Sequence, residues 1–504
     1  MARLLKLPFL VILTALSGLV MLVPAAHAVR IGDFFTARAF LHSGVLILLL
    51  TTLIAVATFN RPPAQSARMQ LIALLGGFVV LPVFLGLPLL VLTPQVSAFE
   101  LYFEMLSCLT TTGASVFDHP SAISDPVHLW RGLVGWLGGF LMLLSAVAIF
   151  EPLNLGGFEV YAKAKQSGAA RSIGQIKTAA VSARLTRFAR NIFPPYLALT
   201  LALALALVLT GERPFIAAML AMATLSTSGI SATDMALGMP VGYGGEMVIF
   251  VFLMVALTRV LIPAEGGWQK SVRFWQDNEF KLAMALVATL PLLLFLRHWI
   301  ASAETNAVQD VFASISALWG SVFTVLSFLT TTGFVSTSWH DTVLWSGLHN
   351  TGIMLIGLAV IGGGVATTAG GIKLLRVYAL YKHGMRELQK LSYPSSVGGA
   401  GGAARYIRRE GAYISWMFFM LFAVTTALVM LGLSLTGLNF EQSLSYGTAA
   451  LSTTGPLAQA VLHDGGSYGG LNNWSKAILC AAMVMGRLET LAIIAVVNPD
   501  FWRR

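Results

Sequence analysis

The sequence predicts an all-α polytopic membrane protein, and its composition and the length of its apolar runs predict this class. Of its 504 residues 56% are hydrophobic and only 11% are charged, and the mean hydropathy is +0.77. Charged residues make up about a quarter of an ordinary soluble chain. The apolar runs extend for about 20 residues without polar alternation, which is the length of a membrane-spanning helix and not the pattern of a barrel strand.

Ten apolar runs are candidates for crossings. They lie near residues 8–27, 40–59, 70–93, 128–150, 192–210, 245–263, 281–297, 343–378, 413–436 and 474–497. The first run also resembles a signal peptide, because Arg3 and Lys6 precede it and Ala26-His27-Ala28 has the A-x-A form of a cleavage site. We expect a retained helix, since the charge pattern downstream fits an N-terminus inside the cell.

The distribution of charge predicts how these helices are oriented. The chain has 32 Lys and Arg against 22 Asp and Glu, a formal net charge of +10. In a membrane protein this excess marks cytoplasmic loops, so we expect no nucleic-acid partner. The bases fall in alternate loops, at Arg61, Arg68, Lys163, Lys165, Arg171, Lys177, Arg184, Arg187, Arg190, Lys270, Arg273, Lys382, Arg386, Lys390, Arg405, Arg408 and Arg409. Loops 94–130, 298–342 and 437–473 contain none, which predicts cytoplasmic termini and an acidic outer face.

A short motif that ends in glycine recurs four times, each time after a short apolar helical pattern. The segments are FELYFEMLSCLTTTGAS (99–115), PFIAAMLAMATLSTSGIS (214–231), VFASISALWGSVFTVLSFLTTTGFV (311–335) and FEQSLSYGTAALSTTGP (440–456). Their glycines, Gly113, Gly229, Gly333 and Gly455, are 116, 104 and 122 positions apart. A module of about 110 residues is therefore repeated four times.

Each module has the pattern of a membrane helix, a half-length helix, a Ser/Thr-Gly turn and a second membrane helix. We expect four such helix–pore loop–helix repeats in a pseudo-fourfold arrangement, at residues 66–165, 166–280, 281–390 and 391–504. Residues 1–65 add a leading pair of helices outside the repeat. The segment 391–404 is rich in Gly and Ala and is typical of a flexible linker.

The repeated turns predict a site for an alkali cation. A half-helix that stops inside the membrane leaves carbonyls without helical partners, and such backbone is tolerated only where it lines a cavity. Four copies would surround that cavity with oxygens that replace the water shell of a potassium ion, and we expect each glycine to take the positive φ that aims the carbonyls inward. One Thr-rich turn alone would be ordinary in a membrane helix. The predicted potassium-binding residues are Thr111, Thr112, Gly113, Thr227, Ser228, Gly229, Thr331, Thr332, Gly333, Thr453, Thr454 and Gly455.

The third module also contains IGGGVATTAGGIK at 361–373. So many Gly and Thr residues at mid-membrane depth predict a broken helix and a flexible segment below the turns. The alternative is a close-packing surface of small residues. A phosphate-binding loop is disfavoured because no strand precedes the segment. The residues singled out here are Gly362, Gly363, Gly364, Thr367, Thr368, Gly370, Gly371 and Lys373, and Lys373 itself is either a pore charge or an anchor at the inner face.

Arg487 lies inside the last apolar run, where a guanidinium costs at least a few kcal/mol unless it faces water or a carboxylate. We expect it to face the pore and to repel cations below the turns. The alternative is a structural ion pair with Glu489 or with an acid of another module. His349 and Asn350 are expected to be satisfied polar groups, and the two cysteines, Cys108 and Cys480, indicate neither a disulfide nor a metal site.

These motifs together resemble a TrkH-type subunit of the Trk/Ktr/HKT superfamily of potassium transporters, over nearly the whole chain. The matching stretches are the four turns, Trp136-Leu137-Gly138-Gly139, ATTAGGIKLLR (366–376) and GRLE (486–489). The resemblance implies a homodimer in the bacterial inner membrane, with one pore per protomer and a cytosolic nucleotide-binding regulatory subunit of the TrkA kind. It also implies that the 361–373 segment and Arg487 act as a gate.

Three functions remain to be compared. We expect gated, potassium-selective uptake, because no filter glycine is replaced by the Ser that the resemblance associates with sodium permeation. The alternative is a potassium symporter coupled to sodium or protons, which would need a buried acid on the pathway. A membrane enzyme is disfavoured because no cluster of catalytic residue types occurs. We expect no cofactor, with the potassium ion as the substrate.

Overall fold

The computed structural model describes residues 8–58, 67–151, 157–158, 181–233, 239, 241–258, 277–305, 311–347, 350–393, 409–462 and 465–488. Within these residues the regular secondary structure is entirely helical, and seven helical spans are long and apolar enough to cross a membrane. The prediction of an all-α polytopic membrane protein is confirmed. The basic segments 159–180, 259–276 and 394–408 lie outside the described residues, as do His349, Glu489 and nearly all of the 391–404 linker.

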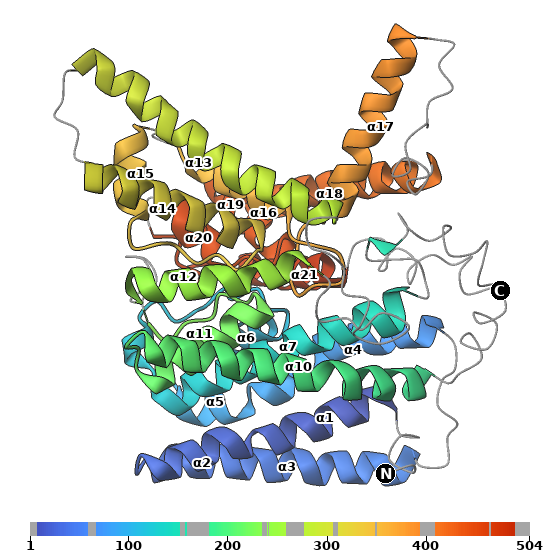
Figure 1. Cartoon of the computed structure of the whole chain (residues 1–504). Coiled ribbons are helices and arrows are strands. Elements are labelled where there is room, and N and C mark those ends of the chain that lie inside the picture. The colour runs from blue at the N-terminus through green and yellow to red at the C-terminus, as the bar shows by residue number, and fades with distance from the viewer. Residues whose placement is uncertain are drawn as a thin grey trace.

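The chain begins with two membrane spans that lie side by side. The first consists of α1 (Phe9–Val20) and α2 (Leu22–Arg30), and the second is α3 (Phe34–Thr58). Asp33 starts α3 as an N-cap does, since its carboxylate accepts the backbone N–H of Thr36 at 3.0 Å. The pair packs against α4 and α7 and lies at the bottom of Figure 1.

The remaining helices form four consecutive groups, and each group contains a short helix that ends in a Ser/Thr-Gly turn. The first group consists of α4 (Ala67–Leu85), α5 (Leu87–Leu92), α6 (Ala98–Leu109) and α7 (Asp125–Ser145), which continues as a π-helical turn (Ala146–Phe150). The second consists of α10 (Val181–Leu209), α11 (Pro214–Ser226) and α12 (Gly242–Leu253), which continues as a 3-10 turn (Met254–Leu257). The third consists of α13 (Asn278–Thr305), α14 (Val311–Leu329), α15 (Trp339–Ser346), α16 (Gly352–Ile361) and α17 (Leu374–Ser392). The fourth consists of α18 (Arg409–Leu435), α19 (Phe440–Leu451), α20 (Pro456–Val461) and α21 (Asn473–Leu488).

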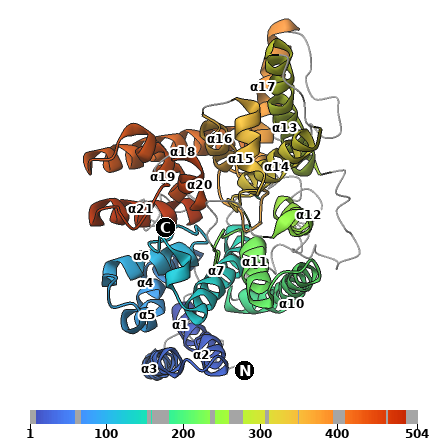
Figure 2. The same cartoon turned by 90° about the vertical axis from the view of Figure 1, so that its left-hand side faces the viewer.

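The short helices lie in the middle of the molecule and the long first helices lie around them. Figure 2 shows α6, α11, α14 and α19 around a central region, with α10, α13 and α18 at the periphery. The second helix of the first group is also more buried than the peripheral first helices. In an 18-residue stretch of Asp125–Phe150 83% of the residues are buried, against 28% in such stretches of Leu185–Leu209 and Gly411–Leu435. Exposed apolar surface on the peripheral helices is what contact with lipid requires.

Two of the short helices begin with a capping box, which closes the orphan N–H groups of the first turn. Ser97 and Glu100 form it at α6, and Asn439 and Gln442 form it at α19. The α11 helix instead begins with Pro214, which has no N–H to satisfy. These signals explain where α6, α11 and α19 start.

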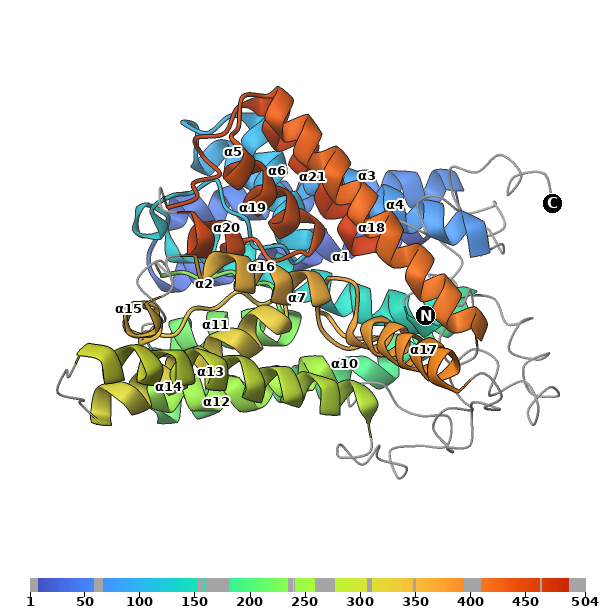
Figure 3. The same ribbon diagram turned by 90° about the horizontal axis from the view of Figure 1, so that it is seen from above.

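Three expected crossings are not continuous helices. The 8–27 run is divided at Met21 into α1 and α2. The 70–93 run is divided at Gly86, just before Pro88, into α4 and α5. The 343–378 run contains the end of α15, the ten residues of α16, a loop and the start of the polar helix α17. The α17 helix projects from the bundle in Figure 1 and is seen nearly end-on in Figure 3. The glycine run accounts for this interruption, as the sequence predicted. The ends of the 245–263 and 474–497 runs lie outside the described residues.

Candidate functional site

The four short helices end in the same backbone conformation. The Thr two residues before each motif glycine has a positive φ, at Thr111 (56°), Thr227 (50°), Thr331 (58°) and Thr453 (54°). The next N–H then donates to the carbonyl five residues earlier, at 2.9, 2.9, 2.9 and 2.8 Å in the four turns. This is a Schellman closure, in which glycine normally takes the left-handed position. A β-branched residue there costs on the order of 1–3 kcal/mol, so the surrounding structure must hold it in place.

Hydroxyl groups repeat in the four turns as well. The side chains three residues and one residue before each glycine bond to each other, as Thr110 and Thr112 (2.9 Å), Ser226 and Ser228 (2.9 Å), Thr330 and Thr332 (3.2 Å), and Ser452 and Thr454 (3.2 Å). Each predicted ligand hydroxyl next to a glycine therefore already has a partner in its own turn. A hydroxyl in such a bond still keeps a lone pair, as a backbone carbonyl does, so the bond orients the hydroxyl without excluding a cation.

The glycines behave alike at three positions and differ at the fourth. Gly113, Gly229 and Gly333 have φ of 76°, 63° and 80°, as expected. The expectation is wrong for Gly455, whose φ is −54° and whose carbonyl accepts a hydrogen bond of 2.8 Å from the Tyr468 hydroxyl. Gly455 directly precedes Pro456, the first residue of α20, and already has helical dihedrals. A following proline disfavours this conformation for residues with a Cβ, and glycine has none. Glycine is still required there, because a Cβ would overlap the backbone of Ala114.

The four turns contact one another. The Gly455 N–H donates to the Thr112 carbonyl at 2.5 Å, which joins the fourth turn to the first. A Cβ on Gly113 would overlap the carbonyl of Ser228, and one on Gly229 would overlap that of Thr332. A Cβ on Gly333 would lie 3.0 Å from Pro456, so each turn contacts the next one and the fourth contacts the first. Segments more than 300 residues apart thus meet within van der Waals distance.

Two further motif glycines bring second helices against the short ones. A Cβ on Gly138 of α7 would overlap the carbonyl of Leu109, the last residue of α6. A Cβ on Gly486 of α21 would overlap the carbonyl of Leu451, the last residue of α19. The WLGG and GRLE motifs therefore place glycine where helix backbones touch just before a turn.

The α16–α17 loop, residues 362–373, interrupts the third group. The α16 helix ends at Gly362, which has φ of 72°. The loop then returns on itself, since Ile372 and Lys373 donate their N–H groups to the carbonyls of Val360 and Ile361, both at 2.9 Å. Ala366 and Lys373 have positive φ, at 59° and 86°, which is rare for residues with a side chain.

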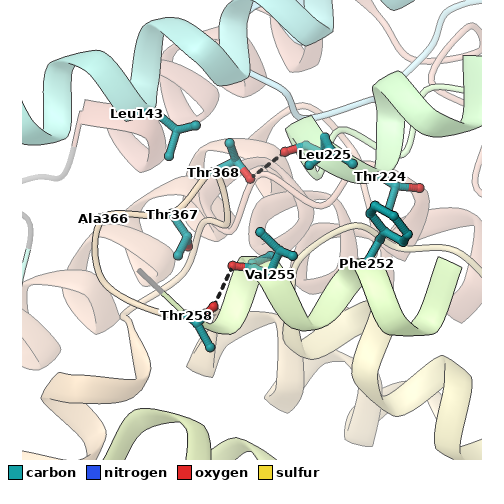
Figure 4. A pocket seen from close by; sticks show the side chains of 10 residues that line it. Leu143, Thr224, Leu225, Phe252, Val255, Thr258, Ala366, Thr367 and Thr368 are labelled. Atoms are coloured by element: carbon teal, nitrogen blue, oxygen red, sulfur yellow. Dashed lines mark hydrogen bonds between the residues drawn. The ribbon is translucent and has the colours of Figure 1, made fainter. Parts of the chain in front are cut away.

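This loop touches the turns of other groups as well as its own. The Gly370 N–H donates to the Thr331 hydroxyl at 2.8 Å, and a Cβ at Gly370 would overlap the carbonyl of Ser452. The Thr368 hydroxyl donates to the Leu225 carbonyl at 3.2 Å, as Figure 4 shows. At its other end, the Val365 N–H donates to the Glu279 carboxylate at 2.8 Å. The loop is held to three of the four groups at once.

Arg487 lies beside this loop and is 3% exposed. Its Nη1 donates to the Thr368 carbonyl at 2.7 Å, while Nε and Nη2 have no hydrogen-bond partner among the described residues. A cavity of about 20 Å³ is lined by both Arg487 and Lys373, and the Lys373 ammonium donates to the Ala369 carbonyl. No described carboxylate forms an ion pair with Arg487, and the alternative partner Glu489 lies outside the described residues.

Two polar contacts between the first and fourth groups could not be predicted from the sequence. Lys476 of α21 pairs with Glu100 of α6 at 2.5 Å, and the Ser467 hydroxyl donates to Asp118 at 2.6 Å. Both contacts connect the fourth group to the first. The only sequence signal is the presence of an acid or a base within an apolar pattern, and it does not reveal the partner.

Comparison with known proteins agrees with this architecture. The family model for TrkH, described as a cation transport protein, matches residues 37–502. The chain is 30% identical over 445 residues to the Trk system potassium uptake protein TrkH of Vibrio parahaemolyticus, covering 85% of this chain and 86% of that protein. It is 29% identical over 483 residues to the Trk system potassium uptake protein TrkI of Halomonas elongata, covering 93% and 91%.

A solved structure is similar over the whole chain. The crystal structure of the potassium transporter TrkH from Vibrio parahaemolyticus superposes with a TM-score of 0.76 at 26% identity and covers 99% of both chains. The family is one of transport proteins, in agreement with the expectation that the chain is not an enzyme. Because the family model spans nearly all of its residues, the chain belongs to the TrkH family of cation transport proteins.

Proposed function

We propose that this chain takes up potassium through a gated pore whose selectivity filter is formed by the four turns. The observation that carries the proposal is the mutual contact of the turns, which links Thr112, Ser228, Thr332 and Gly455 in one place. Backbone oxygens gathered there suit a dehydrated potassium ion. The relatives are named as potassium uptake proteins, which supports the choice of ion.

The α16–α17 loop is the proposed gate, together with Arg487. The loop bonds to the third turn and to Arg487, so its position and that of the guanidinium are coupled. A buried positive charge with unpartnered N–H groups would repel a cation leaving the filter. Displacement of the loop would carry the Thr368 carbonyl away from Arg487 and open the path.

We further propose a homodimer in the bacterial inner membrane with both termini in the cytoplasm. The bases of α17, Lys382, Arg386 and Lys390, lie on the cytoplasmic side in this orientation. The relatives belong by name to a Trk system, which supports a further, TrkA-type regulatory subunit.

The test is potassium uptake by a bacterium that lacks its own uptake systems. Expression of the chain should restore growth at low potassium, and growth equal to the empty vector contradicts the proposal. Purified protein in liposomes at imposed voltage then separates a pore from a symporter. Flux that follows voltage without a sodium or proton gradient is expected, and flux that needs such a gradient at fixed voltage favours the symporter.

A further inference from the structure

Glu246 lies in the second turn of α12 and is completely buried. It belongs to the second group of helices, but its carboxylate contacts the third. Ser336 and Thr337, which donate hydrogen bonds to it, follow Gly333 by three and four residues. Since three residues of extended chain reach at most about 11 Å, the carboxylate lies close to the third turn.

Four donors surround this carboxylate. Trp319 Nε1 donates to Oε2 and the Thr337 N–H donates to Oε1, both at 2.8 Å. The hydroxyls of Ser336 and Thr337 add bonds of 2.9 and 3.1 Å. The Ser336 hydroxyl also accepts the Ser338 N–H at 3.2 Å, which leaves its hydrogen for Glu246. Each oxygen thus receives an N–H that can only donate, the arrangement that suits an ionised carboxylate.

The acid that holds the segment after the first turn, in contrast, is neutralised. Glu104 accepts the N–H of Val116, three residues after Gly113, at 2.8 Å, so it holds the segment after the first turn. Arg131 lies 2.7 Å from that carboxylate. Among the described residues no basic side chain lies within ion-pair distance of Glu246, whose four bonds all come from neutral groups.

A buried carboxylate without a basic partner is unfavourable, because neutral hydrogen bonds replace only part of its hydration. Its charge acts through a medium of lower effective dielectric constant than water, so it attracts a cation that has lost water nearby. This inference rests on the proposed function: we propose that Glu246 is a positioning residue that sets the affinity of the third turn for potassium. Its uncompensated charge raises the affinity of the third turn for the ion, and its hydrogen bonds position the segment that follows this turn.

The experiment separates the charge from the hydrogen bonds. Glu246→Gln removes the charge at nearly constant size, whereas Trp319→Phe and Thr337→Val each remove one donor and keep the charge. Initial uptake is measured against external potassium in uptake-deficient cells, with the amount of each variant in the membrane quantified. The half-saturating potassium concentration should rise on the order of tenfold in Glu246→Gln and by less than about twofold in the other two.

Two results would overturn the proposal. One is an unchanged half-saturating concentration in Glu246→Gln, and the other is an equal rise in Trp319→Phe and Thr337→Val, which would assign the effect to the hydrogen bonds. If Glu246→Gln does not reach the membrane, Glu246→Asp replaces it: an unchanged value supports the role of the charge, and a tenfold rise refutes it. A wild-type chain that takes up no potassium contradicts the proposed function instead, so the two failures are distinct.

Discussion

The backbone N–H of Gly370 donates a hydrogen bond of 2.8 Å to the hydroxyl of Thr331. The first residue belongs to the α16–α17 loop, and the second is the left-handed residue of the third turn. The loop is therefore attached directly to a turn that it is proposed to gate. Any movement of the loop away from the turns must break this bond and leave a buried N–H without an acceptor.

Thr331→Val should release the loop. The substitution keeps the β-branched shape but removes the acceptor for Gly370, which destabilises the docked loop by about 1–3 kcal/mol. Potassium uptake by cells that lack the proposed regulatory subunit should rise severalfold. Thr331→Ser, which keeps the hydroxyl, is the control and should behave like the wild type. Equal uptake by the Val and Ser variants at equal expression would show that this bond does not restrain the loop.

Arg487→Gln should raise the rate of uptake at saturating potassium. It removes the positive charge beside the loop while an amide can still donate to the Thr368 carbonyl. Uptake under a fixed membrane potential, normalised to protein in the membrane, is the measurement. Arg487→Lys keeps the charge and should stay near the wild-type rate. Loss of the Gln variant from the membrane would instead favour a structural role for the guanidinium.

Periodicity and the repeated motif were sufficient to predict the helical fold. Seven of the ten apolar runs form membrane-length spans in the described residues, and the short helices before each glycine and the interruption at 361–373 are present there as well. These features depend on local sequence, since an apolar run of this length has few alternatives in a membrane. Glycines in a helix interior weaken it wherever they occur.

Tertiary contacts account for what the sequence did not predict. The left-handed position at Thr111 and its equivalents contradicts the local preference of Thr and persists because the neighbouring turns hold it. Gly455 has helical dihedrals because it leads directly into α20, a short helix that no apolar run predicts. Glu246 contacts residues about 90 positions away, and no periodicity predicts which donors will surround a buried acid.

Gly138→Ala should destabilise the protein, because the new methyl group would overlap the Leu109 carbonyl at a helix contact with no room to move. Overpacking of this kind costs about 1–3 kcal/mol. Gly384 lies within α17, and a methyl group added to it would meet no other atom within 4 Å. Gly384→Ala should therefore be neutral or stabilising by about 0.5–1 kcal/mol. Thermal unfolding in detergent compares the two, and equal melting temperatures would contradict the close contact.

Gly113→Ser should weaken the discrimination of potassium from sodium. Gly113 has φ of 76°, and any Cβ there would overlap the carbonyl of Ser228, an oxygen of the proposed filter. The Cβ would lie 2.0 Å from that oxygen, where real contacts are at least 3.0 Å, so the carbonyl and the first turn must move apart by about 1 Å or more. The carbonyl positions set the relative affinity for the two ions. The measurement is the potassium-to-sodium ratio of fluxes in liposomes, which should fall severalfold.

The control for this prediction is Gly211→Ser. Gly211 has φ of 102° and nothing within 4 Å of a Cβ, so the substitution imposes the same kind of backbone strain away from the turns. It should lower stability by about 1 kcal/mol and leave the flux ratio unchanged, because strain of a surface turn does not reach the filter carbonyls. If the flux ratio falls equally in both variants, the effect comes from general instability. If the ratio is unchanged in Gly113→Ser, the first turn is not part of the filter.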